Sequence, residues 1–353
     1  MFRSGSTYVF DKFRRAGGFT CYQEPFNEEL IELNFKPEKL LKPPCANSID
    51  LRHPALNSPY FHEYYCAREY LRNKFFKAFS YSQYFTGPSL PELQKAYIAA
   101  LIDIASARPL LQFCRSSGRI QALKTTFGGV HIHLWRDPQS QWWSYKVSNY
   151  FDATVQATYD ADRLPPVLAE IRNLTLSQSC RHRSVNREIQ FFRRNALNAK
   201  EQYTLFYGLW LYSFIENERH TSISICINNL SESHYRAKAT KQLLDAGIGG
   251  VSFDDANLEN VPISQEELPF YGCIEEEVER IFRSYAYSSE EVSAALFSAR
   301  GSGFTPKVPL VETLQKQVVQ LRAIVLTQLT PVQIQQRARG WREKINILGR
   351  LRT

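Results

Sequence analysis

Five consecutive residues near the start of the chain have the composition of an anion-binding loop. They are Arg3, Ser4, Gly5, Ser6 and Thr7. Because an apolar helical pattern follows directly, their backbone N–H groups would face a ligand from a helix N-terminus, where the helix dipole also favours negative charge. Gly5 lets the backbone come close, and the Arg3 guanidinium adds a permanent positive charge. The run lacks the glycine spacing and the lysine of a kinase-type phosphate loop, and taken alone it also fits an ordinary loop before a helix.

A second candidate segment begins with Arg136-Asp137-Pro138, directly after the apolar residues 130–135. A charged residue at the carboxyl end of a parallel strand lies where α/β sheets bind ligands. Asp137 suits the N-cap of a following helix and Pro138 its first turn, so Ser144 would lie about two turns along that helix. Arg136 and Ser144 can then hold one phosphate, the guanidinium with two hydrogen bonds and the hydroxyl with one. Alone, the tripeptide also fits a capped helix start.

Four short apolar runs, separated by helical patterns, predict the sheet that positions these segments. The expected strands are residues 19–22, 109–114, 128–135 and 223–227. Helices are expected after the first loop, around 117–126 and near 233–246, and strand–helix alternation of this kind is typical of a parallel α/β fold. Five prolines make 36–60 an irregular connection, and an aromatic-rich, helical stretch is expected over 60–85. Val311 to Val325 predict a further helix in the tail.

Composition favours a protein that binds anions. The 353 residues include 43 Lys and Arg against 35 Asp and Glu, a net charge of +8. Seven cysteines show no paired zinc spacing and are expected to be reduced thiols. No run of about 18 apolar residues and no signal-peptide core is visible, so we expect a cytoplasmic protein without a membrane span.

Together, the two candidate segments resemble the PAPS-dependent sulfotransferases, where PAPS is 3′-phosphoadenosine 5′-phosphosulfate. In that family an N-terminal Arg-Ser-Gly-Ser/Thr loop opens a helix, and a later strand ends in Arg-Asp-Pro with a serine eight residues after the arginine. Residues 22–27, Tyr-Gln-Glu-Pro-Phe-Asn, are similar to a stretch of bacterial-type members. The resemblance covers residues 2–30 and 109–150 well and 220–260 loosely.

The resemblance implies a three-layer P-loop-type parallel sheet flanked by helices, with helical, aromatic-rich insertions. It implies an α/β domain over 1–270, with a helical insertion at about 55–100 and a helical C-terminal extension over 271–353. Family members carry a hydrophobic strand ending in proline before the loop, whereas this chain begins at Met1-Phe2. We therefore expect either a coding start further upstream or a sheet that lacks its central strand.

The resemblance also assigns roles within the site. Arg3, Ser4, Gly5, Ser6 and Thr7 would hold the 5′-phosphosulfate of PAPS, with Arg3 stabilising charge on the leaving phosphate. Arg136 and Ser144 would hold the 3′-phosphate. No metal is required for this transfer, because positioning and charge stabilisation dominate sulfuryl transfer as they do phosphoryl transfer.

Glu24 is the candidate base for the acceptor hydroxyl, since it ends a predicted strand close to the loop, is ionised at neutral pH and would be a better base if burial raised its pKa. Glu28 and Glu29 are alternatives. His131 and His133 could also act as the base, but their place in the strand favours buried histidines held by their neighbours. Arg115 and Arg119 follow a predicted strand and can touch the nucleotide or form exposed salt bridges. Trp142 and Trp143 can stack on an adenine or pack in the core.

The acceptor itself is not specified by the sequence, although the bacterial-type resemblance favours a carbohydrate over a lipid, a peptide tyrosine or a small phenol. A P-loop nucleotide kinase-like enzyme is one alternative function. A non-catalytic basic protein that binds an acidic polymer is another, suggested by the arginines between 181 and 194 and between 337 and 352. No nucleic-acid partner is expected, because no nucleic-acid-binding module is recognisable.

Overall fold

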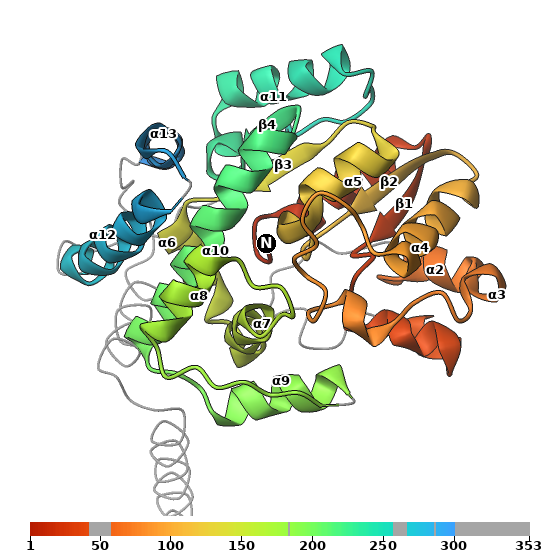
Figure 1. Ribbon diagram of the computed structural model, residues 1–353. Helices are drawn as coiled ribbons and strands as arrows, with labels where there is room; N and C mark the ends of the chain where they lie inside the picture. The colour runs from red at the N-terminus through yellow and green to blue at the C-terminus, as the bar shows by residue number, and fades with distance from the viewer. Residues whose placement is uncertain (42–57, 183, 257–266, 286, 301–353) are drawn as a thin grey trace, which may run out of the picture.

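Two pairs of parallel strands form the sheet structure of the protein (Figure 1). The structure, a computed structural model, describes residues 1–41, 58–182, 184–256, 267–285 and 287–300. Strand β1 (Phe19–Gln23) pairs with β2 (Arg108–Gln112), and β3 (Ile132–Trp135) pairs with β4 (Ile223–Cys226). The four expected strands are confirmed, and so is their parallel direction. The described residues form two separate pairs, however, and the single three-layer sheet that we expected is not shown.

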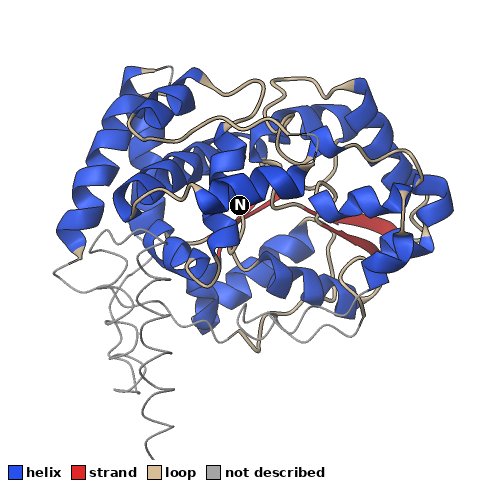
Figure 2. Ribbon diagram, turned by 90° about the horizontal axis from the view of Figure 1, so that it is seen from below, coloured by secondary structure: helices blue, strands red, loops and turns tan. Residues whose placement is uncertain are grey.

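Helices make up most of the described chain (Figure 2). The α-helices are α1 (Ser6–Ala16), α2 (His62–Cys66), α3 (Arg68–Leu71), α4 (Glu92–Asp103), α5 (Ile120–Phe127), α6 (Pro138–Tyr145), α7 (Asn149–Tyr159), α8 (Pro166–Asn173), α9 (Val185–Arg194), α10 (Ala199–His220), α11 (Ser233–Asp245), α12 (Leu268–Ser284) and α13 (Ser289–Arg300). The 3₁₀-helices are η1 (Glu28–Asn34), η2 (Pro37–Leu41), η4 (Lys77–Phe79), η5 (Ser117–Arg119) and η6 (Ile227–Ser231).

Helix α1 follows the candidate loop, as the apolar spacing predicts. It buries Val9, Phe10 and Phe13 in a cluster with Ile223 and Ile225 of β4. Packing on this strand fixes where the helix begins, and therefore where the preceding loop lies.

Helix α10 runs through the middle of the molecule (Figure 1). It starts with a capping box, in which the Asn198 side chain accepts from the Glu201 amide and the Glu201 carboxylate accepts from the Asn198 amide. Nearly all of residues 203–215 are buried, so its apolar surface is not confined to one stripe. A helix buried on all sides organises the core around it, and α12 and α13 pack against it.

The aromatic-rich stretch forms a second core. Residues 60–85 contain three short helices rather than one long one, and Tyr64, Phe75 and Phe79 are fully buried beside Tyr97 of α4. The helix expected from Val311 to Val325 lies outside the described residues, so the boundary at 270 stays a prediction. None of the described helices is long and apolar enough to cross a membrane.

Candidate functional site

The carboxyl ends of the four strands hold the residues from which we build the site. Glu24 follows β1 and its amide donates to Gln112 O at 2.7 Å, which continues the ladder with β2. Arg115 comes three residues after β2, Arg136 directly after β3 and Ile227 directly after β4. Ligands of parallel sheets bind at this edge.

The loop of residues 3–7 lies between the two strand pairs, with a contact to each. A Cβ atom added to Gly5 would lie 2.7 Å from Cγ2 of Ile227, so only glycine fits there without displacing a buried side chain. On the other side, Ser6 Oγ lies 3.5 Å from Sγ of Cys114, two residues after β2. The structure therefore places the loop beside the carboxyl ends of β2 and β4.

The backbone of the loop is held in a conformation that few residues adopt. Gly5 has φ 76° and ψ 10°, a left-handed conformation that glycine accepts readily. Arg3 also has a positive φ, of 60°, which is unfavourable for a residue with a Cβ atom. Strained positions of this kind cluster at binding sites, where the surrounding structure holds them. Ser4, whose hydroxyl donates to Met1 O at 3.1 Å, is buried.

The structure brings Arg3 and Ser144 together, although they are 141 residues apart. The Nε atom of Arg3 donates to Ser144 Oγ at 2.9 Å. We expected these two side chains to bind opposite ends of one nucleotide, and therefore to lie further apart than a direct hydrogen bond allows. This hydrogen bond uses the Nε donor of Arg3 and an acceptor site of the Ser144 hydroxyl.

Helix α6 begins as its sequence predicts. The Asp137 carboxylate accepts from the Ser140 amide at 2.8 Å, and Pro138 occupies the first turn. The Asp137 amide donates to Asn228 Oδ1 at 2.9 Å, beside Ile227 and hence beside the loop. The backbone of Arg136 is thereby fixed near the loop, and its carbonyl accepts from Trp210 Nε1 at 3.0 Å.

A buried ionic cluster occupies the β1–β2 side of the site. The guanidinium of Arg115 forms ion pairs with Glu24 and Glu28, and all three side chains are less than a tenth exposed. Nη2 of Arg115 lies 2.6 Å from Glu28 Oε2. Two carboxylates therefore share one guanidinium in a site closed to most solvent, where each charge depends on its partners.

Tyrosine hydroxyls complete the cluster. Tyr60 donates to Glu24 Oε1 at 2.7 Å, and Tyr150 donates to Glu28 Oε1 at 2.5 Å. Glu24 has φ 46°, so it is a second strained, non-glycine residue at the same edge of the strands. The side chain of Glu24 is fixed on both oxygens, because its second oxygen also accepts from Asn27 Nδ2 at 3.1 Å.

The pKa of Glu24 is shifted in the direction opposite to the one that burial alone would give. Burial acts to raise the pKa of Glu24, but the Arg115 guanidinium and the Tyr60, Arg115 and Asn27 hydrogen bonds outweigh it and lower that pKa below its ordinary value. Burial and the Glu24 carboxylate raise the pKa of Tyr60, which therefore stays a proton donor. Glu24 is a carboxylate at neutral pH, and a weaker base than an exposed glutamate.

Phe2 connects the ionic cluster to the loop. Its ring lies against the Arg115 guanidinium, 4.5 Å from Cζ to the ring centroid, and contacts the ring of Tyr150. Its carbonyl accepts from Gln141 Nε2 of α6 at 2.7 Å. The cluster, the loop and α6 thus meet around one residue next to Arg3.

Other candidates from the sequence have structural roles. Trp142 is fully buried against Tyr203 and Tyr271, so it packs in the core and does not offer a face to an adenine. His133 is buried and bonded to Glu218 at 2.8 Å. Arg119 does not form the exposed salt bridge considered above, since it is buried with its guanidinium 4.1 Å from the centroid of the Phe26 ring.

The sequence did not indicate that Arg115 joins two glutamates, because the partners lie 87 and 91 residues apart. The only signal was an arginine directly after a buried strand. Comparisons with family models, with curated proteins and with solved structures found no match.

Proposed function

We propose that this protein transfers a sulfuryl group from PAPS to an acceptor hydroxyl. The observation that carries the proposal is the position of the loop of residues 3–7, which contacts the carboxyl-end residues of both strand pairs, with Glu24 and Arg136 at the same edge. We propose further that the two pairs are the halves of a P-loop-type sheet, with the loop between them.

Donor binding would change one contact. We expect the Arg3 guanidinium to leave the Ser144 hydroxyl and to bind the 5′-phosphosulfate together with the amides at the start of α1. Ser144 would then be free to bind the 3′-phosphate with Arg136. The strained φ of Arg3 supports this, because strained residues are often those that move or bind.

In the proposed reaction the acceptor oxygen forms a bond to sulfur while the bond from sulfur to the 5′-phosphate oxygen breaks. Adenosine 3′,5′-bisphosphate leaves with the electron pair of that bond, and Arg3 stabilises its charge. The hydroxyl proton passes to the carboxylate of Glu24. A base with a lowered pKa suffices when the transition state is loose. The hydroxyl then loses its proton late, after the forming bond to sulfur has made it acidic.

Adenosine 3′,5′-bisphosphate binding tests the donor site. We expect this nucleotide to raise the melting temperature of the wild-type protein by a few degrees, because a ligand at 100 times its Kd stabilises by about 2.7 kcal/mol. Arg136→Ala should abolish the shift, whereas Arg283→Ala, near the C-terminal end of α12, should preserve it. A wild-type protein that is indifferent to this nucleotide would contradict the proposal, and stabilisation by Mg-ATP instead would favour a kinase-like enzyme.

A further inference from the structure

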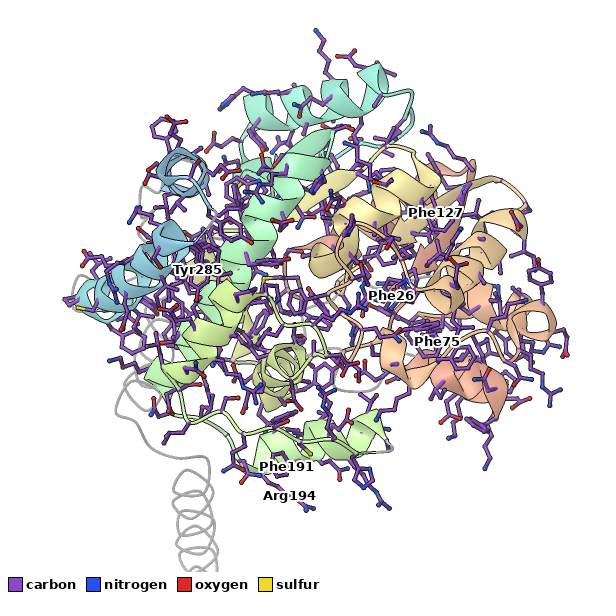
Figure 3. The ribbon with its side chains drawn as sticks, viewed as in Figure 1. Phe26, Phe75, Phe127, Phe191, Arg194 and Tyr285 are labelled. Carbon is purple, nitrogen blue, oxygen red and sulfur yellow. The ribbon has the colours of Figure 1, made fainter. Side chains whose placement is uncertain are left out.

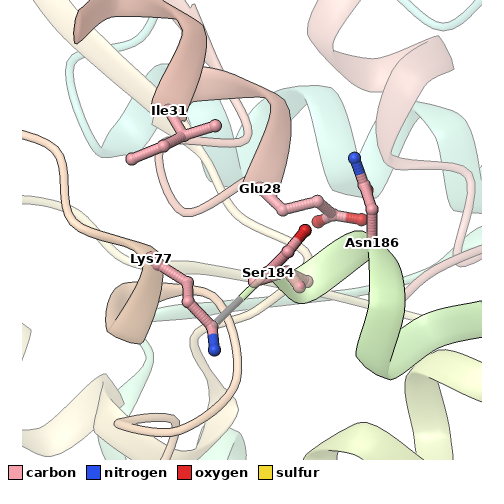
Figure 4. Close-up of a pocket in the computed structure, with 6 residues that line it drawn as sticks. Glu28, Ile31, Lys77, Ser184 and Asn186 are labelled. Atoms are coloured by element: carbon pink, nitrogen blue, oxygen red, sulfur yellow. The ribbon is translucent and has the colours of Figure 1, made fainter. Parts of the chain in front are cut away.

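A small pocket adjoins the ionic cluster, since Glu28 belongs to both. It has a volume of about 220 Å³ and is lined by Glu28, Ile31, Lys77, Ser184, Val185 and Asn186 (Figure 4). Glu28 belongs to the cluster, so one guanidinium, that of Arg115, separates the pocket wall from the candidate base Glu24.

The lining of the pocket suits a sugar ring. Figure 4 shows the Glu28 carboxylate, the Ser184 hydroxyl and the Asn186 side chain gathered on one side, with the Lys77 amine directed away from them. Lys77 Nζ instead bonds Glu188 at 2.8 Å. Carboxylate, hydroxyl and amide groups exchange hydrogen bonds with sugar hydroxyls. The volume admits one ring rather than an extended ligand, which pockets of about 300–1,000 Å³ accommodate.

Helix α9 leads from the pocket and presents a positively charged outer face. It begins beside the pocket at Val185, and Arg187, Arg193 and Arg194 are exposed on it. The helix contains a single acidic residue, Glu188, which is buried against Lys77. Arg187 contacts His182, and Arg193 donates to Asn149 Oδ1 at 2.7 Å. Within the described part of the chain none of the three arginines pairs with a carboxylate.

The spacing of two of these arginines fits an elongated ligand. Arg187 and Arg194 are seven residues apart, which places them on one face of the helix with a rise of about 10.5 Å between them. Arg194 points away from the body of the molecule (Figure 3). Guanidinium groups in such a row bind carboxylates or sulfates through paired hydrogen bonds.

We propose that the outer face of α9 and the adjoining pocket bind an anionic polysaccharide, which is the acceptor of the sulfuryl group. This proposal rests on the function proposed above and specifies its acceptor. Acidic groups of the polymer bind Arg187 and Arg194, and one sugar ring enters the pocket beside Glu28. A nucleic acid fits less well, because no aromatic side chain lines the pocket to stack on a base.

Binding of heparin, used as a sulfated probe, tests this surface without requiring turnover. We expect the double variant Arg187→Glu/Arg194→Glu to bind heparin about tenfold more weakly than the wild type at moderate salt, since two attractive pairs become repulsive. The matched control is Lys238→Glu/Lys241→Glu on the exposed side of α11, which has the same change in net charge and should alter affinity by less than about twofold.

The pocket needs its own variant. Asn186 is exposed, so Asn186→Trp should fold normally while filling the entrance. We expect it to weaken binding of a heparin tetrasaccharide about tenfold and to leave the melting shift by adenosine 3′,5′-bisphosphate unchanged. Retained tetrasaccharide affinity would overturn the pocket as the binding site.

Two further outcomes would overturn the surface as a whole. One is an equal loss of heparin affinity in the α9 and α11 variants, which would indicate a general charge effect. The other is tighter binding of single-stranded nucleic acid than of heparin. If instead heparin binds at α9 while adenosine 3′,5′-bisphosphate has no effect, the polysaccharide surface stands and the sulfotransferase function fails.

Discussion

At the scale of single residues, the site is defined by a guanidinium that two carboxylates share. Removing Arg115 from such a cluster would leave two buried charges with hydroxyl and amide partners alone, and breaking a buried pair in this way costs roughly 3–5 kcal/mol. The cluster therefore holds Glu24 in one position and keeps it ionised at neutral pH. A fixed carboxylate at the edge of the strands is the arrangement that a proton acceptor requires.

Replacing Glu24 by Gln tests its role as the base. The amide keeps the shape of the side chain and can still accept from Tyr60, while Arg115 keeps its pair with Glu28. We therefore expect the melting shift by adenosine 3′,5′-bisphosphate to persist and sulfuryl transfer to fall by about 10²–10⁴-fold, measured by mass spectrometry of sulfated product.

Glu29→Gln is the matched control, since Glu29 is exposed and lies five residues further along. Its turnover should equal that of the wild type. Full activity of the Glu24 variant would show that another group accepts the proton.

At the scale of elements, the strands were predictable because short apolar runs ended by turn residues leave few alternatives. The helix after the loop was predictable from Val9, Phe10 and Phe13, and the cap of α6 from Asp137 and Pro138. The aromatic stretch was not, because its side chains bury against α4 from several short turns, and periodicity within the segment does not reveal such packing.

Contacts between distant segments were the least predictable part of the site. The hydrogen bond from Arg3 to Ser144 joins residues of the right types, yet the sequence favoured separate phosphates for them. Nothing in the spacing of Tyr60 and Tyr150 indicated that both donate into one carboxylate cluster. Such contacts depend on how whole elements pack, which local patterns do not encode.

The fit of the loop against β4 gives a prediction at this scale. Gly5→Ala places a Cβ atom against the buried Ile227 and in a left-handed conformation, so we expect it to destabilise the protein by about 2–4 kcal/mol. Gly247→Ala is the control, because Gly247 also has a positive φ of 73° but no atom lies within 4 Å of an added Cβ.

Urea unfolding of the two variants compares them directly. The Gly247 variant should lose only the backbone contribution, roughly 1 kcal/mol. Equal losses in the two variants would mean that the loop is not held against Ile227.

At the scale of the whole molecule, the loop and helix α1 connect the two strand pairs, since one apolar cluster contains Phe10 of α1, Cys21 of β1 and Ile225 of β4. No strand of the described residues pairs with both sheets, and the loop adds to this cluster the contacts of Ser6 with Cys114 and of Gly5 with Ile227. The candidate donor loop is therefore also part of the connection between the two strand pairs.

Burial of charge near this connection predicts how the whole protein responds to acid. The Glu24 pKa lies below its ordinary value of 4.5, so the stability that Glu24 contributes is present above pH 4.5 and is lost as pH falls through its folded pKa. Burial lowers the pKa of His133 below 6.5, so the unfolded chain takes up this proton first as pH falls. Both effects reduce the free energy of unfolding, the histidine below about pH 6.5 and the glutamate below about pH 4.5.

Urea unfolding between pH 7.5 and pH 3 separates the two stages. Glu24→Gln should flatten the fall in the free energy of unfolding below pH 4.5, by about 1.4 kcal/mol for each tenfold change in proton affinity that it removes, and should leave the slope between pH 5 and pH 6.5 unchanged. His133→Gln should flatten the slope between pH 5 and pH 6.5 and should leave the fall below pH 4.5 unchanged. A Glu24 variant whose stability falls below pH 4.5 as steeply as that of the wild type would mean that Arg115 does not hold this carboxylate ionised, and the ionic cluster would then be no basis for a poised proton acceptor.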